Sequence, residues 1–178
     1  MDPARGVRKL KFVDNGATIA IRGAHRPMLK GIDPLLNADV LHALRVMGHG
    51  DQLVITDANF PAHACAESTV LGTPLRIDAP IVRVVEAVMS VMPLDTYLSD
   101  AAMRMEVIDA PDEMPPVQRE VLDALRHAEG EEVSLVGVER FAFYDLAKKS
   151  FAVLQTAERR FYGCFILSKG VVPPEDEE

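Results

Sequence analysis

Cysteine is scarce in this chain of 178 residues: only Cys65 and Cys164 occur, far apart and outside any CxxC spacing. Such usage argues against a disulfide scaffold and against a cysteine zinc site, and it fits reduced thiols in a cytoplasmic protein. No stretch approaches the roughly 18 apolar residues of a membrane span, and no apolar segment near the N-terminus indicates export. We therefore expect a cytoplasmic location and no membrane partner.

Positive charge is also in deficit. The 19 Lys and Arg residues are outnumbered by 27 Asp and Glu residues, which gives a formal net charge of −8. Such a charge repels phosphate backbones, so a nucleic-acid partner is not expected. The hydrophobic share of 48% and the charged share of 26% are typical of a globular protein, and the length suits one domain.

A glycine-rich phosphate loop is missing as well. The segment Gly48-His49-Gly50-Asp51 lacks the further glycine of a GxGxxG motif, and it precedes a predicted strand instead of following one. There is no internal repeat and no low-complexity tract. A Rossmann nucleotide site is therefore not supported.

Helical and strand patterns alternate along the chain from Met28 onward. The first predicted helix begins after Asn37, which can act as its N-cap, and ends at Gly48, which suits a left-handed position. A second helix is predicted after the cap residue Asp78, with Pro80 just inside it, and Pro93 stops it. Two further helices are predicted at Pro116–Glu129, which Gly130 terminates, and at Phe141–Ser150. Strands are predicted around Leu53–Ile55, ending at Asp57, and at Ala101–Ile108, Glu132–Val138, Phe151–Thr156 and Phe165–Leu167. This alternation predicts an α/β fold with a mostly parallel sheet and helices on both faces.

The organised part of the chain does not include its ends. Residues 1–27 show no sustained period, and we expect an N-terminal extension that is either unstructured or an over-extended start. The domain is predicted over residues 28–172, and residues 173–178 form an acidic tail.

Two polar residues flank the strand at Leu53–Ile55. His49, between two glycines, is suited to proton transfer near neutral pH, although an exposed turn histidine is the plainer interpretation. Asp57 lies at the carboxyl end of the strand, where ligands of such sheets bind; it can accept hydrogen bonds from hydroxyls, orient His49 or simply cap the loop. Together with His63 these residues form only a weak metal pattern.

Aromatic and polar residues gather in two later segments. Arg140-Phe141-Ala142-Phe143-Tyr144 stands at a strand-to-helix junction, and Tyr162-Gly163-Cys164 precedes the last strand. Phenols can hydrogen-bond while their ring faces pack against a ligand, whereas phenylalanines at such positions normally belong to the core. Neither cysteine has a paired base adjacent in sequence that would make it a nucleophile.

Several motifs, in order from Met28 to Val172, resemble the fucose mutarotase and ribose pyranase family. The segments that carry the resemblance are 28–32 with 34–36, Met47-Gly48-His49-Gly50-Asp51, Asp57-Ala58-Asn59-Phe60-Pro61-Ala62-His63, Arg140–Tyr144, and Tyr162-Gly163 followed by 166–171. The 60–63 loop and the 140–144 segment are similar to the fucose branch.

The resemblance implies a three-layer α/β domain in a ring-like homo-oligomer, often a decamer, with sites between neighbouring subunits. It implies a cofactor-free, metal-free isomerase that interconverts the anomers of a free monosaccharide, L-fucose or a related sugar. It gives His49 the role of catalytic acid, and it makes substrate contacts of Asp57, Arg140, Tyr162, Gly163 and Cys164; His63 and Tyr144 are second-tier candidates. Cys164 stands where the family usually has asparagine, which leaves the substrate open.

Two other functions fit the same residues. A ribose-type pyranase would interconvert pyranose and furanose forms by the same ring opening. A non-catalytic module would bind a monosaccharide in the same pocket without turnover.

Overall fold

The computed structural model of the protein describes residues 29–174. The predicted N-terminal extension at 1–27 lies outside the described residues, as do Met28 and residues 175–178 of the predicted acidic tail. In the described part of the chain, no helix combines the length and the apolar character needed to cross a membrane.

Helices and strands alternate in the structure, as the sequence predicts. In chain order the elements are α1 (Ala38–Val46), β1 (Gln52–Thr56), α2 (Ala62–Ala66), β2 (Leu75–Ile77), α3 (Ile81–Met89), β3 (Ala102–Met105), α4 (Pro116–Glu129), β4 (Val136–Val138), α5 (Arg140–Lys149), β5 (Ala152–Thr156) and β6 (Phe165–Ser168). The bounds of α4 coincide with the prediction, since Pro116 fits the first turn and Gly130 follows at a φ of 107°.

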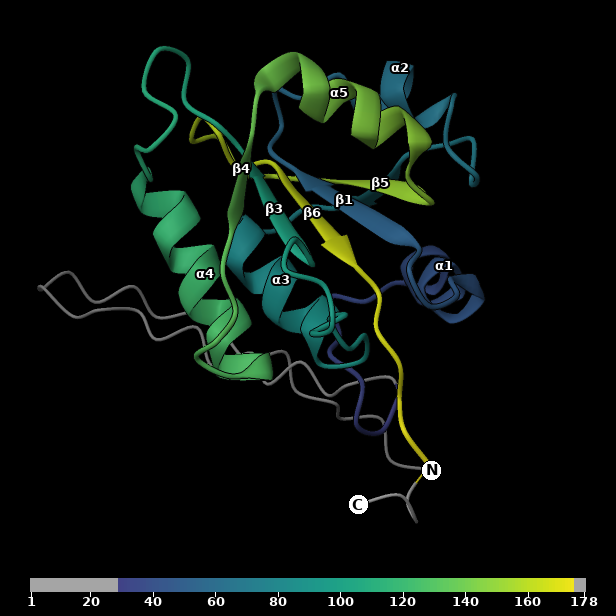
Figure 1. Cartoon of the computed structure of the whole chain (residues 1–178). Coiled ribbons are helices and arrows are strands. Elements are labelled where there is room, and N and C mark those ends of the chain that lie inside the picture. Colours follow the sequence, from purple (N-terminus) through teal and green to yellow (C-terminus); the bar gives the residue numbers. More distant parts are fainter. Residues whose placement is uncertain (1–28, 175–178) are drawn as a thin grey trace, which may run out of the picture.

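Within residues 29–174 the six strands form one sheet in the order β2-β5-β1-β6-β3-β4. The β1–β5, β2–β5 and β3–β4 pairs are parallel, whereas β6 pairs antiparallel with both β1 and β3. The mostly parallel sheet is therefore confirmed. Because β6 runs the other way (Figure 1), the residues that precede it lie at the same edge as the carboxyl ends of the other strands.

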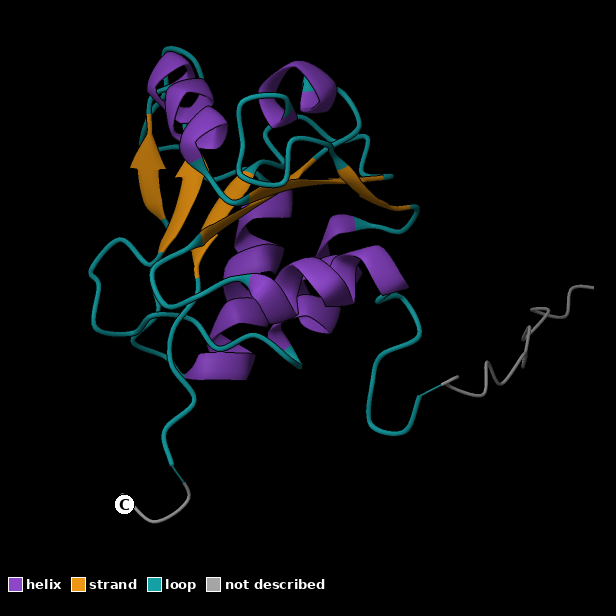
Figure 2. Cartoon of the chain, turned by 90° about the vertical axis from the view of Figure 1, so that its right-hand side faces the viewer, coloured by secondary structure: helices purple, strands orange, loops and turns teal. Residues whose placement is uncertain are grey.

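Helices cover both faces of the sheet and give three layers (Figure 2). Along β1, Leu53 and Ile55 face a core shared with α1, α3 and α4, while Val54 faces a second core shared with α2 and α5. The alternation follows from the two-residue period of a strand, and a strand apolar on both faces belongs in the middle of the layers. The prediction of helices on both faces is confirmed.

Several boundary predictions were wrong. Helix α1 has the predicted cap, since the Asn37 side chain accepts a hydrogen bond from the Val40 N–H. Gly48, however, is not in the left-handed conformation; Gly50 adopts that conformation instead, with a φ of 83°. Asp78 caps nothing and instead pairs with Arg76 at 2.8 Å, and α3 ends at Met89, before Pro93. Strands β3 and β4 are shorter than predicted, and the sequence reading missed α2 and β2.

Gly170, just after β6, packs against the backbone of the loop that follows α3. Its N–H donates to the Pro93 carbonyl at 2.8 Å. A Cβ at Gly170 would lie 2.8 Å from the Leu94 carbonyl carbon and 3.0 Å from the Asp95 nitrogen, both backbone atoms. Only glycine permits so close an approach of two backbones.

We predict that Gly170→Ala lowers the free energy of unfolding by about 1–3 kcal/mol, because the loop must shift to admit a methyl group. Urea denaturation measures the change. Gly48→Ala is the matched control, since its Cβ would meet only the Asp51 side chain, at 3.7 Å. Equal stability of the two variants would contradict the packing argument.

Candidate functional site

A pocket of about 420 Å³ opens at the sheet edge where β1 and β3 end and β6 begins. It is lined by Asp57, Asn59, Phe60, Met105, Ile108, Arg140, Tyr144, Phe161, Tyr162 and Cys164. Five of the residues predicted from sequence line it: Asp57, Arg140, Tyr144, Tyr162 and Cys164. They come together because β6 is antiparallel, so the segment before β6 lies beside the segment after β1.

Asp57 is the buried carboxylate of this pocket, with 5% of its surface exposed. Its Oδ1 accepts from the backbone N–H groups of Asn59 at 2.9 Å and Phe60 at 3.1 Å, which folds the loop back over the strand end. Burial raises the pKa of Asp57 above its usual 3.8, and these backbone hydrogen bonds oppose the rise. Its other oxygen, Oδ2, faces the thiol of Cys164 at 3.6 Å.

Cys164 lines the pocket beside Asp57, and Gly163 precedes it in the same loop. Cys164 is 3% exposed, and burial together with the neighbouring carboxylate raises the pKa of its thiol well above 9. It is therefore a neutral thiol that donates to Asp57, and it is not an activated nucleophile. A Cβ on Gly163 would lie 3.4 Å from the Asp57 Cβ and 3.3 Å from the Glu158 Cγ, so Gly163 lets the loop pass close to both.

Arg140 and Tyr144 lie one helical turn apart at the start of α5. Arg140 Nε donates to the Tyr144 hydroxyl at 3.3 Å, and its guanidinium lies 5.7 Å from the centroid of the Tyr144 ring. The Tyr144 ring in turn packs against Phe60, with centroids 5.5 Å apart. One wall of the pocket thus combines aromatic faces with a cation that can donate to hydroxyl groups.

Tyr162 holds an uncommon backbone conformation, with a φ of 64°. Its hydroxyl accepts from the Ile108 N–H at 3.4 Å, and its carbonyl accepts from Gln118 Nε2 at 3.0 Å. Gln118 is fully buried on α4, and the same amide also donates to the Met105 carbonyl at 2.8 Å. A non-glycine residue at this φ persists only where its surroundings fix it, and Gln118 provides that fixation.

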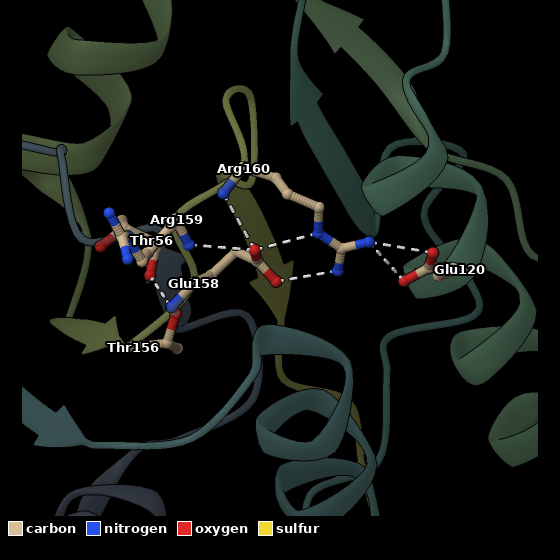
Figure 3. Close-up of polar contacts among 6 residues, drawn as sticks. All are labelled: Thr56, Glu120, Thr156, Glu158, Arg159 and Arg160. Carbon is tan, nitrogen blue, oxygen red and sulfur yellow. Dashed lines mark hydrogen bonds and ion pairs between the residues drawn. The ribbon is translucent and has the colours of Figure 1, made fainter.

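The β5–β6 loop that carries Tyr162 is held by Glu158 (Figure 3). The Glu158 carboxylate accepts from Arg160 Nε at 3.0 Å and Nη2 at 2.8 Å, and from the Arg159 and Arg160 backbone N–H groups at 3.0 Å each. Arg160 Nη1 reaches across to both oxygens of Glu120 on α4, at 2.9 Å. These contacts hold the pKa of Glu158 down to about 2.

His49, the predicted catalytic acid, lies away from this pocket. It precedes β1, whereas Asp57 follows β1, and five strand residues separate their ends by about 17 Å. Asp57 therefore does not orient His49 within one chain. The partner of His49 is Asp95, with Nε2 and Oδ2 2.8 Å apart.

His63 does not join either group. It is exposed on the short helix α2 and does not line the pocket. His49, Asp57 and His63 accordingly do not form one three-ligand metal site. Across residues 29–174 no set of three or more His, Cys, Asp or Glu side chains is arranged to hold a metal ion.

A larger pocket of about 590 Å³ contains none of the predicted site residues. It is lined by Leu94, Thr96, Tyr97, Leu98, Ser99, Ala101, Ala102, Glu129, Glu132, Val133 and Ser134. It lies near the His49 edge, since Leu94 bridges to Lys169 just after β6.

Sequence reasoning missed Asp95 and Gln118, and it also missed the pocket residues Ile108 and Phe161. Asp95 lies 46 positions from His49 and Gln118 lies 44 positions from Tyr162, so no local spacing links the pairs. Gln118 did carry a signal, because an amide on the apolar face of a predicted helix must find a buried hydrogen-bond partner.

The chain resembles known proteins over nearly all of its described length. The model of the RbsD / FucU transport protein family matches residues 30–172. The fucose mutarotase of Bos taurus is 43% identical over 155 residues, which cover 84% of this chain and 97% of that protein.

Two solved structures are also similar. The crystal structure of protein Atu2016 is 54% identical, with a TM-score of 0.81, and covers 83% of this chain and 99% of its own. The fucose mutarotase of Streptococcus pneumoniae, solved in complex with L-fucose, is 31% identical, with a TM-score of 0.73, and covers 82% of this chain and 100% of its own.

We predict that Glu158→Gln lowers the free energy of unfolding by about 2 kcal/mol at pH 7. This value is smaller than the full pKa shift of Glu158 would give, because the guanidinium of Arg160 is half exposed and water screens its charge. The folded pKa of about 2 lies below the usual 4.5, so the carboxylate stabilises the fold above pH 4.5 and this contribution disappears as the pH falls toward 2. The difference between variant and parent should shrink accordingly in urea titrations at descending pH. Glu131→Gln, on an exposed glutamate, is the control, and a pH-independent difference would refute the charge assignment.

Proposed function

The chain belongs to the RbsD/FucU family, and from this premise we propose that it is a sugar mutarotase, an isomerase that interconverts the α and β anomers of a free monosaccharide. L-Fucose or a related sugar is the proposed substrate, as the names of the relatives support. The observation that carries the proposal is the pocket, where a buried carboxylate, two phenols, a guanidinium and aromatic faces converge in about 420 Å³. These are the groups that bind hydroxyls and the apolar face of a sugar ring.

The reaction requires only proton transfers. The ring oxygen gains a proton and the C1 hydroxyl loses one while the bond between C1 and the ring oxygen breaks, which gives an open-chain aldehyde. Rotation about the bond between C1 and C2, followed by the reverse proton transfers, closes the ring on either face of the carbonyl. Protons balance over the cycle, and a histidine that takes and returns a proton can serve it.

In our assignment Asp57 accepts from sugar hydroxyls, Arg140 donates to them, and Tyr162 with Gly163 and Cys164 contacts the ring. Tyr144 supports Arg140 from the adjacent turn of α5, through its hydroxyl at 3.3 Å. His63 has no role in this assignment, because it lies outside the pocket. Cys164 offers a thiol where the family usually has an asparagine amide, so the contact at this position is weaker, and a sugar other than L-fucose remains compatible.

We propose that His49 completes the pocket of a neighbouring copy of the chain in a ring-like homo-oligomer, a decamer in the form implied by the resemblance. Apolar side chains at both edges support this assembly. Tyr97 is 85% exposed two residues after Asp95, while Phe161 and Phe141 are 73% and 68% exposed around the pocket. Exposed aromatic clusters of this kind are typical of interfaces.

The remaining proposals concern the domain and its location. The family match over residues 30–172 supports the predicted domain at 28–172. Two free, buried cysteines are compatible with a cytoplasmic location, which we retain as a proposal.

Saturation-transfer NMR on equilibrated sugars tests the activity. We expect accelerated exchange between the α and β anomeric protons of L-fucose, measured against D-ribose at equal protein concentration. Faster exchange between pyranose and furanose forms of D-ribose would identify a pyranase instead. Sugar binding without any acceleration would identify a binding module, and either result would overturn the proposal.

We expect His49→Gln to lower the exchange rate at least about a hundredfold while sugar binding persists, because glutamine keeps the hydrogen bonds but carries no titratable proton. His42→Gln, an exposed histidine on α1, is the matched control and should retain full activity.

The shared site adds a sharper test. Asp57→Asn chains, defective in the pocket, are co-expressed with His49→Gln chains and the mixed oligomers isolated. With random mixing, about a quarter of the sites pair an intact His49 from one chain with an intact pocket from the other, so about a quarter of the wild-type activity should return. Failure of the mixed oligomers to regain activity would contradict a site built from two copies.

A further inference from the structure

A buried arginine lies between the sheet and α4. Arg104, on β3, is only 6% exposed. Its Nη2 donates to the Pro111 carbonyl at 2.8 Å, and its Nη1 donates to the Glu113 carbonyl and to Gln118 Oε1, both at 3.3 Å. All three acceptors are uncharged, and Nε has no hydrogen-bond partner among residues 29–174. Because burying a charge among neutral acceptors is costly, an apolar side chain would serve stability alone better.

The contact with Arg104 sets the orientation of the Gln118 amide. A guanidinium only donates hydrogen bonds, so the amide oxygen must face Arg104. Nε2 is therefore turned to the other side, where it donates to the carbonyls of Met105 at 2.8 Å and Tyr162 at 3.0 Å. Since carbonyls only accept, the reversed amide would lose all three contacts. Gln118 is fully buried, so water cannot replace them.

Arg104 and Gln118 together hold two loops that line the pocket. Arg104 binds two backbone carbonyls of the loop between β3 and α4, and Gln118 binds the carbonyl of Tyr162 in the β5–β6 loop. The loops meet where the Ile108 N–H donates to the Tyr162 hydroxyl at 3.4 Å. Because this oxygen accepts from Ile108, its own hydrogen stays free to donate to a sugar oxygen.

Each of these loops contains an uncommon backbone conformation. Within residues 29–174, Asp109 and Tyr162 are the two non-glycine residues with a positive φ, at 61° and 64°. Such conformations cost free energy, persist only where contacts fix them, and concentrate at functional sites. Both strained residues therefore lie in the loops that Arg104 and Gln118 hold.

We propose that Arg104 and Gln118 are positioning residues for the reaction: Arg104 orients the Gln118 amide, and Gln118 holds Tyr162 so that its hydroxyl reaches the sugar. The inference rests on the proposed function and deepens it, because it names two buried residues that place a sugar contact. Neither side chain lines the pocket, so their effect must pass through Tyr162. They should therefore influence sugar binding more than the proton transfer assigned to His49.

The first test is Gln118→Met, which keeps the length of the side chain and removes the amide. We expect KM for L-fucose, from saturation-transfer NMR at increasing sugar concentration, to rise about fivefold to twentyfold with kcat changed less than threefold. Val121→Ala, at a fully buried core position one turn further along α4, is the matched control. It should lower stability and leave KM and kcat unchanged. An unchanged KM in folded Gln118→Met would overturn the proposal.

A double-mutant cycle separates positioning from general damage. If Gln118 acts through the Tyr162 hydroxyl, Gln118→Met should add less than about a twofold change in KM to Tyr162→Phe. Effects that multiply would refute the proposal, since Gln118 would then act independently of Tyr162. If Gln118→Met does not fold, Gln118→Glu takes its place, because it keeps an acceptor for Arg104 and loses both N–H donors.

Arg104→Met tests the other member of the pair. It leaves the Gln118 amide without its guanidinium donor, so KM should rise as in Gln118→Met. The double variant should show no higher KM than Gln118→Met alone, because the two residues act as one unit. A wild-type KM in Arg104→Met would contradict the role of Arg104.

The two proposals fail separately, because backbone NMR of the Ile108 amide reports on positioning without activity. Gln118→Met should shift the Ile108 N–H resonance as its contact with the Tyr162 hydroxyl lengthens, whereas Val121→Ala should not. If no sugar shows accelerated exchange with wild-type protein, the proposed function fails, and this resonance still decides whether Gln118 holds Tyr162. If exchange is observed and neither KM nor the resonance responds to Gln118→Met, only the positioning role is lost.

Discussion

The antiparallel pairing of β6 with β1 and β3 is the constraint on which the rest of the structure depends. Were β6 parallel, the segment before it would lie at the opposite edge, far from Asp57. With β6 reversed, its start carries Tyr162, Gly163 and Cys164 to the edge where β1 and β3 end. Its far end extends into residues 168–170, which hold the loops of His49 and Asp95. One strand thus organises both polar edges of the sheet.

At the pocket edge, buried polar contacts hold the β5–β6 loop in one conformation, because this loop has no regular secondary structure of its own. Glu158 gathers two backbone N–H groups and the Arg160 guanidinium, and Gln118 holds the carbonyl of Tyr162. Both groups are anchored by α4, through Glu120 and through Gln118 itself. A helix packed on one face of the sheet therefore fixes the geometry of a pocket at the sheet edge, which suits a site that must keep hydroxyl-binding groups in place.

The residues proposed to bind the sugar and the residue proposed to transfer the proton lie at opposite edges of the sheet. The groups proposed to bind the sugar are at one end of β1, and the group proposed to move the proton is at the other, with about 17 Å of strand between them. A single chain cannot bring both to one sugar ring. Activity would then depend on assembly, and the exposed aromatic residues near both edges provide the surfaces that assembly would bury.

The sequence by itself determined the parts of this protein that depend on local signals. Helix α4 could be delimited because proline and glycine mark its two ends, and β1, β5 and β6 because short apolar runs bounded by polar residues favour buried strands. The five-residue helix α2 and the three-residue strand β2 could not, because neither is long enough to display a period. The order of motifs also indicated the family and five of the ten pocket residues.

Only the tertiary structure decided which of those residues meet. Tyr162 and Asp57 share a pocket, and His49 pairs with Asp95, because of the direction of β6, and a strand's sequence pattern is the same in either direction. Asp95 and Gln118 could not be identified from sequence, since a buried polar side chain reveals its role only through a partner more than 40 positions away. Hydrophobic periodicity reports which face of an element is buried, and it carries no information about which element lies opposite.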